Sequence, residues 1–195
     1  HLEPFDNDDA SSFLSASLGA ERAKIVVEHF CARELSALLG NPQTLELIAR
    51  VARTGNLPET RSKLFESGIE LLRGEYRDGK GDVEPAKEAG LDAAGAACAC
   101  LILTGNEAIV RKASANLVEG ELKLVEIIQL AGGDAIKAML GTRLFKADGA
   151  ERFCYLHRRI GEFLAARWLA KQADTPSKRR RLFALFHSHG LVPAR

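Results

Sequence analysis

Residues 141–157 read GTRLFKADGAERFCYLH, and this stretch decides the fold. Two runs with aromatic side chains, which strands favour, flank Asp148-Gly149, a residue pair typical of a tight hairpin turn. The pattern predicts a two-stranded β-hairpin over residues 142–157 and no larger sheet. A helix is expected to follow it, from about residue 159 to about residue 172.

Helical patterns precede the hairpin. Pro42 is expected to begin one helix, because the missing N–H of proline costs nothing in a first turn, and Thr60 is expected to cap the next. The polar loop at residues 77–82 predicts an internal break. The clearest apolar stripe after it contains Leu91, Ala94, Gly95, Cys98, Leu101 and Ile102. Its small side chains predict that a neighbouring helix approaches closely.

Four further segments are also interpreted as helical. A helix that begins at Glu21 is expected to bury one stripe and to end at Gly40-Asn41. That stripe is Val27, Cys31, Leu35 and Leu38, with Phe30 beside it. Shorter helices are expected to run through Val110 and from residue 121 to residue 130. Thr175 and Pro176 then predict the start of a last helix.

The composition limits the possible functions. The chain has 195 residues, 46% of them hydrophobic, and 27 basic against 26 acidic side chains leave a net charge of +1. No net field therefore attracts nucleic acid or a membrane surface. Four cysteines in a chain of this length do not indicate a disulfide framework. A reduced, cytoplasmic protein is expected, and the apolar run at residues 91–103 is too short to span a membrane.

No catalytic or metal-binding constellation is found in the sequence. The Gly79-Lys80 pair lacks the other residues of a phosphate-binding loop, and His187 and His189 are two positions apart, which separates them on a helix. The basic run at residues 178–181 could contact phosphates, although a solvated helix face is the more frequent meaning of such a run. We therefore expect that the chain is not an enzyme by itself.

Three short elements nevertheless carry a family resemblance. Residues 38–45 read LLGNPQTL and resemble the N-P-x-x-L element that follows the nucleotide-binding core of NACHT ATPases. Residues 57–65, LPETRSKLF, resemble the stretch that opens the next helix in that family. Residues 153–166, FCYLHRRIGEFLAA, resemble the family's F-x-H-x-x-x-x-E-[FY]-x-A-A signature. The similarity is greatest to large bacterial signal-transduction ATPases of the NACHT type.

The resemblance implies a mainly α fold divided into three segments. Residues 1–57 would form a helical domain after the ATPase core. Residues 58–158 would form a winged-helix-like domain with one β-hairpin, and residues 159–195 would begin a further helical domain. The phosphate-binding loop and the acidic strand that holds magnesium are missing. The resemblance therefore implies a segment of a larger ATPase, with no cofactor of its own and ADP or ATP with Mg²⁺ bound in the full-length protein.

Two residues would contact the nucleotide if the resemblance holds. In the family, the proline at the position of Pro42 packs against adenine, and the histidine at the position of His157 contacts the β-phosphate of ADP and locks the closed state. Without the family, Pro42 is more simply a helix start and His157 a structural histidine. Gly161 occupies a position where the family commonly has glutamine, so any role of that amide is lost. We expect His157 at the end of the second hairpin strand, at least partly exposed, and bordering the same concave side as Pro42.

Two classes of function remain open. In the first, the chain is the regulatory arm of an ADP/ATP switch in bacterial defence or stress signalling. Its partners would be its own upstream nucleotide-binding domain, a downstream sensor domain and, in the full-length protein, other copies of itself, without specific nucleic acid or a membrane. In the second, it is a free-standing winged-helix DNA-binding regulator. The helix at about residues 133–140 discriminates between them, because it offers only Asp134 and Lys137 where a recognition helix needs base-reading side chains.

Overall fold

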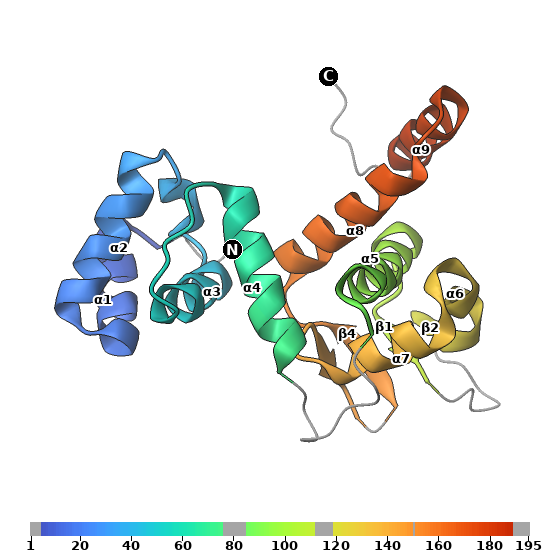
Figure 1. The fold of residues 1–195 in the computed structure, drawn as a ribbon, viewed down its shortest axis with the longest axis horizontal. Coiled ribbons are helices and arrows are strands. Elements are labelled where there is room, and N and C mark those ends of the chain that lie inside the picture. Colours follow the sequence, from blue (N-terminus) through green and yellow to red (C-terminus); the bar gives the residue numbers. More distant parts are fainter. Residues whose placement is uncertain (1–4, 76–84, 112–118, 150, 189–195) are drawn as a thin grey trace. The chain divides into compact units, whose positions relative to one another are not determined.

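The computed structural model describes residues 5–75, 85–111, 119–149 and 151–188, and for residues 187 and 188 the backbone alone. The expected loop at 77–82 lies outside them. The chain forms two compact units that divide between Leu72 and Arg73, within the last turn of helix α4 (Figure 1). Helices make up most of the described residues, as the mainly α fold class predicted.

The first unit is built from helices. They are α1 (Asn7–Leu18), α2 (Ala20–Ala32), the short 3₁₀ helix η1 (Ser36–Leu38), α3 (Pro42–Arg53) and most of α4 (Arg61–Gly74). Their buried side chains form one apolar core. Its largest members are Leu14, Phe30, Leu39, Leu45, Ile48, Leu64 and Leu72. An apolar core of this kind is the main term that stabilises such a unit.

Side-chain caps fix where these helices begin. Asp6 forms a capping box at the start of α1, in which its carboxylate accepts from the backbone N–H of Asp9 at 2.8 Å. The expected start at Pro42 is confirmed, with Asn41 Oδ1 accepting from Thr44 N at 3.1 Å. The expected cap at Thr60 is also confirmed, since its Oγ1 accepts from Lys63 N at 3.2 Å. Each cap satisfies a backbone donor that the first helical turn leaves open.

The second unit combines helices with a small sheet. Its helices are α5 (Lys87–Thr104), α6 (Leu124–Ala131), α7 (Gly133–Gly141), α8 (Arg158–Gln172) and α9 (Pro176–Ser188). Its strands are β1 (Ala108–Val110), β2 (Glu121–Lys123), β3 (Phe145–Ala147) and β4 (Arg152–Tyr155). The order in the sheet is β2-β1-β4-β3, parallel between β1 and β2 and antiparallel elsewhere. The chain order of this unit is helix, two short strands, two helices and the hairpin. The assignment of this unit to the winged-helix class stays a prediction.

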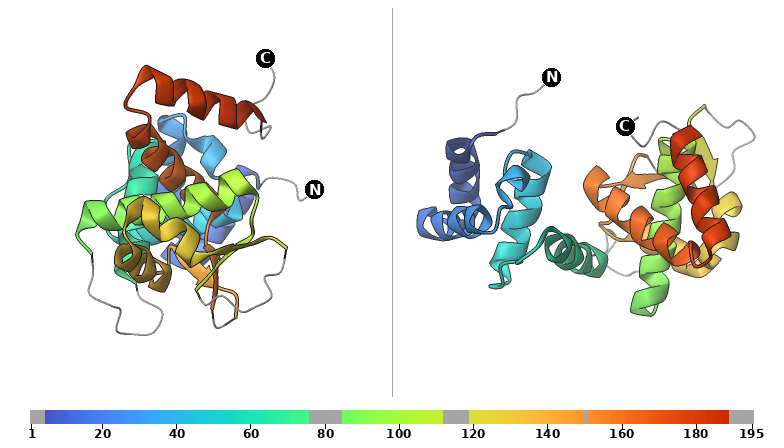
Figure 2. Two further views of the ribbon diagram at one scale, coloured as in Figure 1. Left: turned by 90° about the vertical axis from the view of Figure 1, so that its right-hand side faces the viewer. Right: turned by 90° about the horizontal axis from the view of Figure 1, so that it is seen from above.

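Helix α5 is buried on nearly every side. Its sequence from Gly90 to Ala99 is almost entirely buried, which extends well beyond the single predicted stripe. Helix α8 packs along α5 (Figure 1 and Figure 2). A Cβ atom on Gly95 would lie 2.7 Å from the backbone oxygen of Leu164 in α8. The predicted close approach of a second helix to this small-residue segment is therefore confirmed.

Four details of the sequence analysis are wrong. The hairpin β3–β4 is present, but it belongs to a four-stranded sheet. Strand β1 occupies the place of the short helix that was expected through Val110. Residues 121–123 form β2 before helix α6 begins. Helix α2 ends at Ala32 and buries Ala23, Val26 and Phe30, whereas Val27 is only partly buried and Cys31 is exposed. The apolar residues of α2 occupy more than one face, and packing selects the face that carries Phe30.

The three-segment division at residues 57 and 158 stays a prediction. Helix α8, which that division assigns to a further domain, packs on α5 within the second unit. No helix among the described residues is long and apolar enough to cross a membrane.

Candidate nucleotide-sensing site

Pro42 stands at the exposed start of α3. It is the first helical residue after Asn41, whose side chain caps the helix. Its ring lies on the surface of the first unit, where an apolar plate could meet a flat base. The chain before it is held in place by a backbone hydrogen bond from Phe5 N to Gly40 O of 3.1 Å. Pro42 is thus a rigid, accessible residue, which suits the proposed contact and equally suits a simple helix start.

His157 lies between the hairpin and the next helix. The backbone continues past β4 with a hydrogen bond from Leu156 N to Leu144 O of 2.9 Å, and His157 then caps α8 in an extended conformation. Its carbonyl oxygen accepts from Gly161 N at 2.9 Å. The predicted place of His157, after the second hairpin strand, is therefore where the structure has it.

The exposure expected for His157 is wrong. Only 7% of the residue is accessible, and it is one of three buried polar residues among the described part of the chain. The cause is its position at a corner where β4, α8 and the core of the second unit meet. A ligand can reach the imidazole only after the ring, or a neighbouring segment, moves outward.

Two neighbours of His157 have their own structural roles. Gly161 is in contact with Tyr155, and a Cβ atom at position 161 would lie 3.0 Å from the Tyr155 ring. A glutamine, which the family commonly has there, would require the Tyr155 ring to shift by a few tenths of an ångström. Arg158 Nε donates to Glu162 Oε1 at 2.9 Å, which is an ion pair within α8. The bond to Glu162 raises the pKa of Arg158 further above its ordinary value.

Pro42 and His157 belong to different units, with Pro42 in the first and His157 in the second. A shared nucleotide site that both residues border stays a prediction. Pro42 is exposed in its unit, and His157 is buried in its own.

Helix α7, which precedes the hairpin, has few side chains with which to read DNA. It buries Ile136, Met139 and Leu140. Its exposed side chains are Asp134 and Lys137, which form an ion pair with each other at 3.5 Å. A recognition helix needs arginine, lysine, asparagine or glutamine directed at base edges. Helix α7 offers one lysine with a carboxylate beside it, so its composition is poor for base recognition.

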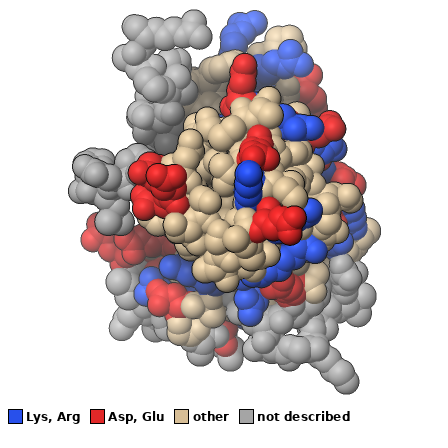
Figure 3. Space-filling model, turned by 90° about the vertical axis from the view of Figure 1, so that its left-hand side faces the viewer, with Lys and Arg blue, Asp and Glu red and all other residues tan. Residues whose placement is uncertain are grey.

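The basic run at residues 178–181 is exposed on α9. Lys178 Nζ lies 2.9 Å from Asp174 Oδ1, and Arg179 Nε donates to the carbonyl oxygen of Ala173 at 3.0 Å. These contacts occupy part of the run within its own helix and turn. Figure 3 shows a different face, on the side of α1 and α2 in the first unit, where basic and acidic side chains are interspersed and neither sign dominates.

The described residues contain no group of three or more histidine, cysteine or acidic side chains that could hold a metal ion. All four cysteines are free, with Cys98 buried and Cys31 exposed. Among the described residues, neither observation indicates a catalytic site.

The structure also brings together polar residues that the sequence analysis did not single out. They line a groove of about 600 Å³ in the first unit, between α2 and α4 above the turn at residues 55–59. Its basic side chains are Arg22, His29, Arg33 and Lys63. The spacing of seven and four residues along α2 places the first three on one helix face, and this spacing is the signal that could have found them.

The comparisons with known proteins identify no relative. No family model matches the chain, and no curated protein matches it significantly.

Proposed function

We propose that the chain is the regulatory helical and winged-helix region of a NACHT-type ATPase switch. It responds to whether ADP or ATP is bound and passes that state on as a change of conformation and assembly. It acts in the cytoplasm, with its own nucleotide-binding domain as its first partner.

One observation carries this proposal: a histidine follows the β-hairpin of the second unit and occupies the N-cap position of the next helix. His157 stands at the start of α8, a helix of 15 residues. The N-terminus of a helix attracts anions, because its open N–H groups and its dipole both favour negative charge. Arg158 and Arg159 in the first turn add positive charge there. The surroundings of His157 therefore suit a phosphate group.

The burial of His157 gives the proposed switch a mechanical step. If ADP holds the imidazole through its β-phosphate, the ring has to leave the position that it occupies here. A ligand shifts a conformational equilibrium only through contacts that differ between the two states. A ring that is buried in one state and bound to phosphate in the other is such a contact.

DNA binding is the alternative, and the paired Asp134 and Lys137 on α7 argue against it. Fluorescence anisotropy with mixed duplexes at physiological salt should show only weak, salt-sensitive binding through residues 178–181. Nanomolar, sequence-dependent binding would favour the DNA-binding regulator instead.

The first test is the coding sequence upstream. A phosphate-binding loop roughly 150–200 residues before this segment, about the length of one domain, is expected. An open reading frame without such a loop contradicts the proposal. The 195-residue chain itself is expected neither to hydrolyse ATP nor to bind it tightly, because no phosphate-binding loop or magnesium ligand set is found in its sequence. Turnover by the purified chain, free of contaminating ATPase, would overturn that expectation.

The second test removes the proposed contacts in the full-length protein. His157→Ala should lower the ADP that copurifies with the protein and raise basal signalling. The expected change in the equilibrium is about tenfold or more, since a hydrogen bond to a charged group contributes about 1.5–3 kcal/mol. Copurified nucleotide is measured by denaturation and chromatography. Lys146→Ala, which removes an exposed cation from β3 in the same unit, is the matched control.

Loss of a buried imidazole could also weaken the fold, so a second variant is needed. Pro42→Ala changes an exposed residue at a helix start and should leave the thermal unfolding of the chain close to that of the parent. It should weaken the binding of ADP more than that of inorganic pyrophosphate, because the proposed contact is with adenine. Unchanged ADP occupancy in both His157→Ala and Pro42→Ala would end the proposed site.

A further inference from the structure

The turn at residues 55–59, which lines the groove between α2 and α4, is hydrogen-bonded to side chains of α2. Arg22 Nη2 donates to the carbonyl oxygens of Ala52 at 3.2 Å and Gly55 at 3.1 Å. His29 Nε2 lies 2.9 Å from the carbonyl oxygen of Pro58. Since a carbonyl oxygen only accepts, Nε2 carries the hydrogen and the ring orientation is fixed. These bonds hold the turn at residues 55–59 against the helix, so the groove is largely preformed.

Positive charge exceeds negative charge along this groove. Arg22, Arg33 and Lys63 line it, and Glu59 is the one carboxylate among its lining residues. Arg22 and Arg33 form no ion pair with a carboxylate in the described part of the chain, and the bonds of Arg22 to carbonyl oxygens leave its charge uncompensated. Lys63 is exposed and pairs with Glu66 at 2.9 Å, a contact of little strength in water.

An unusual backbone conformation lies beside the groove. Helix α2 ends with hydrogen bonds from Glu34 N to Cys31 O and from Leu35 N to Phe30 O. In this pattern the residue at the position of Glu34 is usually glycine. Here Glu34 has a φ of 59°. Arg33, the residue before it, is thereby kept at the end of α2, where its side chain reaches the groove.

We propose that this groove binds a small ligand that carries phosphate groups. Its volume of about 600 Å³ lies within the range of small-molecule sites. Phosphate presents several charged acceptor oxygens, which suits several converging cations better than a lone carboxylate does. The groove is formed by the first unit alone and includes neither Pro42 nor His157, so the inference does not rest on the proposed nucleotide switch.

The test uses the 195-residue chain and inorganic pyrophosphate. Pyrophosphate should bind with one site per chain and shift the backbone amide resonances of Gly55 and Asn56. Arg33→Gln should weaken binding about tenfold or more, because a charge-assisted hydrogen bond is lost. Adding Lys63→Gln should weaken it further. Both side chains are exposed, so thermal unfolding should be nearly unchanged.

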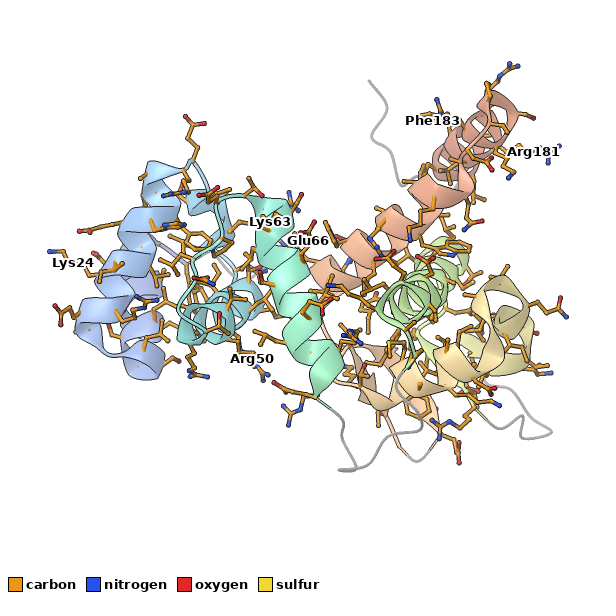
Figure 4. All side chains as sticks on the ribbon, viewed as in Figure 1. Lys24, Arg50, Lys63, Glu66, Arg181 and Phe183 are labelled. Atoms are coloured by element: carbon orange, nitrogen blue, oxygen red, sulfur yellow. The ribbon has the colours of Figure 1, made fainter. Side chains whose placement is uncertain are left out.

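The matched control is Lys24→Gln. It removes one exposed cation from the same helix, and Figure 4 shows Lys24 on the outer side of α2, whereas Lys63 lies on α4. Lys24→Gln should change the affinity less than about twofold, since only the long-range charge differs. Equal losses in Lys24→Gln and Arg33→Gln would show a non-specific charge effect and overturn the proposal.

Two further titrations identify the class of the ligand. AMP and inorganic phosphate are titrated beside pyrophosphate, and tighter binding of AMP than of inorganic phosphate would assign the groove to a nucleotide. AMP binding that is lost in Pro42→Ala but kept in Arg33→Gln would place the nucleotide elsewhere and contradict the proposal. Binding of an acidic peptide without binding of either inorganic anion would also contradict it.

Discussion

In each unit a glycine lets two helices approach, and Gly68 in the first unit and Gly95 in the second differ in what lies opposite. In the first unit, a Cβ atom on Gly68 of α4 would lie 2.4 Å from Leu47 Cδ1, an atom at the end of a side chain. In the second unit, a Cβ atom on Gly95 of α5 would lie 2.6 Å from Trp168 Cβ and 2.7 Å from the carbonyl oxygen of Leu164. A leucine can change rotamer, but the backbone of α8 cannot move without moving the whole helix. The same residue type is therefore replaceable in one unit and fixed in the other.

Gly95→Ala tests this comparison with the largest expected effect. Alanine gains helix propensity of about 0.5–1 kcal/mol over glycine, but overpacking against a rigid neighbour costs more. We expect the free energy of unfolding of the second unit to fall by about 3 kcal/mol. Denaturant unfolding followed by hydrogen exchange at the α5 amides measures the effect. A stabilised variant would show that α8 can shift away from α5 at little cost.

Gly68→Ala is the matched substitution in the first unit. The gain in propensity and the cost of moving Leu47 nearly offset each other, so we expect a loss of about 1 kcal/mol or less. Hydrogen exchange at the amides of α3 and α4 reports it. An effect as large as that of Gly95→Ala would mean that Leu47, which is 2% exposed, is held as firmly as a backbone.

Glu34→Gly should stabilise the first unit. A non-glycine residue at positive φ is strained by roughly 1 kcal/mol, and glycine removes that strain while gaining some freedom in the unfolded chain. The net gain should be below about 1 kcal/mol, measured from the denaturant midpoint. Glu34→Ala is the control, since it removes the same carboxylate but keeps the Cβ atom. If both variants gain equally, charge and not backbone conformation is the cause.

Acid should affect the second unit through the ion pairs between α5 and α8. Glu88 accepts hydrogen bonds from Lys171 Nζ and from Arg167 Nη2, each at 2.8 Å, and these bonds lower the pKa of Glu88 from its ordinary value of 4.5. Because the folded pKa is the lower one, the carboxylate stabilises the fold above pH 4.5, and this contribution is lost as the pH falls through the folded pKa.

Of the four predicted changes in stability, the effect of acid should be the smallest, because the carboxylate of Glu88 is exposed to water. Glu88→Gln should flatten the decline of the denaturant midpoint between about pH 5 and about pH 3. Glu21→Gln is the control, since Glu21 makes no ion pair with the described residues. If the denaturant midpoint declines identically in the parent and in Glu88→Gln, Glu88 does not cause the acid sensitivity.

The parts of the fold that the sequence predicted are those with local causes. Pro42, Thr60 and the turn at Asp148-Gly149 act through their own backbone geometry, and each is found where it was expected. The strands β1 and β2 could not be found, because three-residue strands have no measurable periodicity and exist through their pairing. The face of α2 was misassigned for a related reason, since two apolar stripes share that helix.

The candidate site was predicted less well than the fold. The place of His157 after the hairpin follows from the local sequence, and the structure has it there. Its burial depends on how the start of α8 packs beside β4, which no local pattern encodes. The groove of Arg22, His29 and Arg33 needed the turn at residues 55–59 to be brought against α2, and that contact spans about thirty residues of chain.

The packing around α5 also makes the second unit a reporter of its own opening. Burial raises the pKa of the Cys98 thiol to about 12, so its reactive thiolate is on the order of one molecule in 100,000 at pH 7. Cys31 in the first unit is exposed. A thiol reagent should therefore label Cys31 at once and reach Cys98 only when the packing around α5 opens. The labelling rate of Cys98 then reports how often this packing opens, without an engineered cysteine.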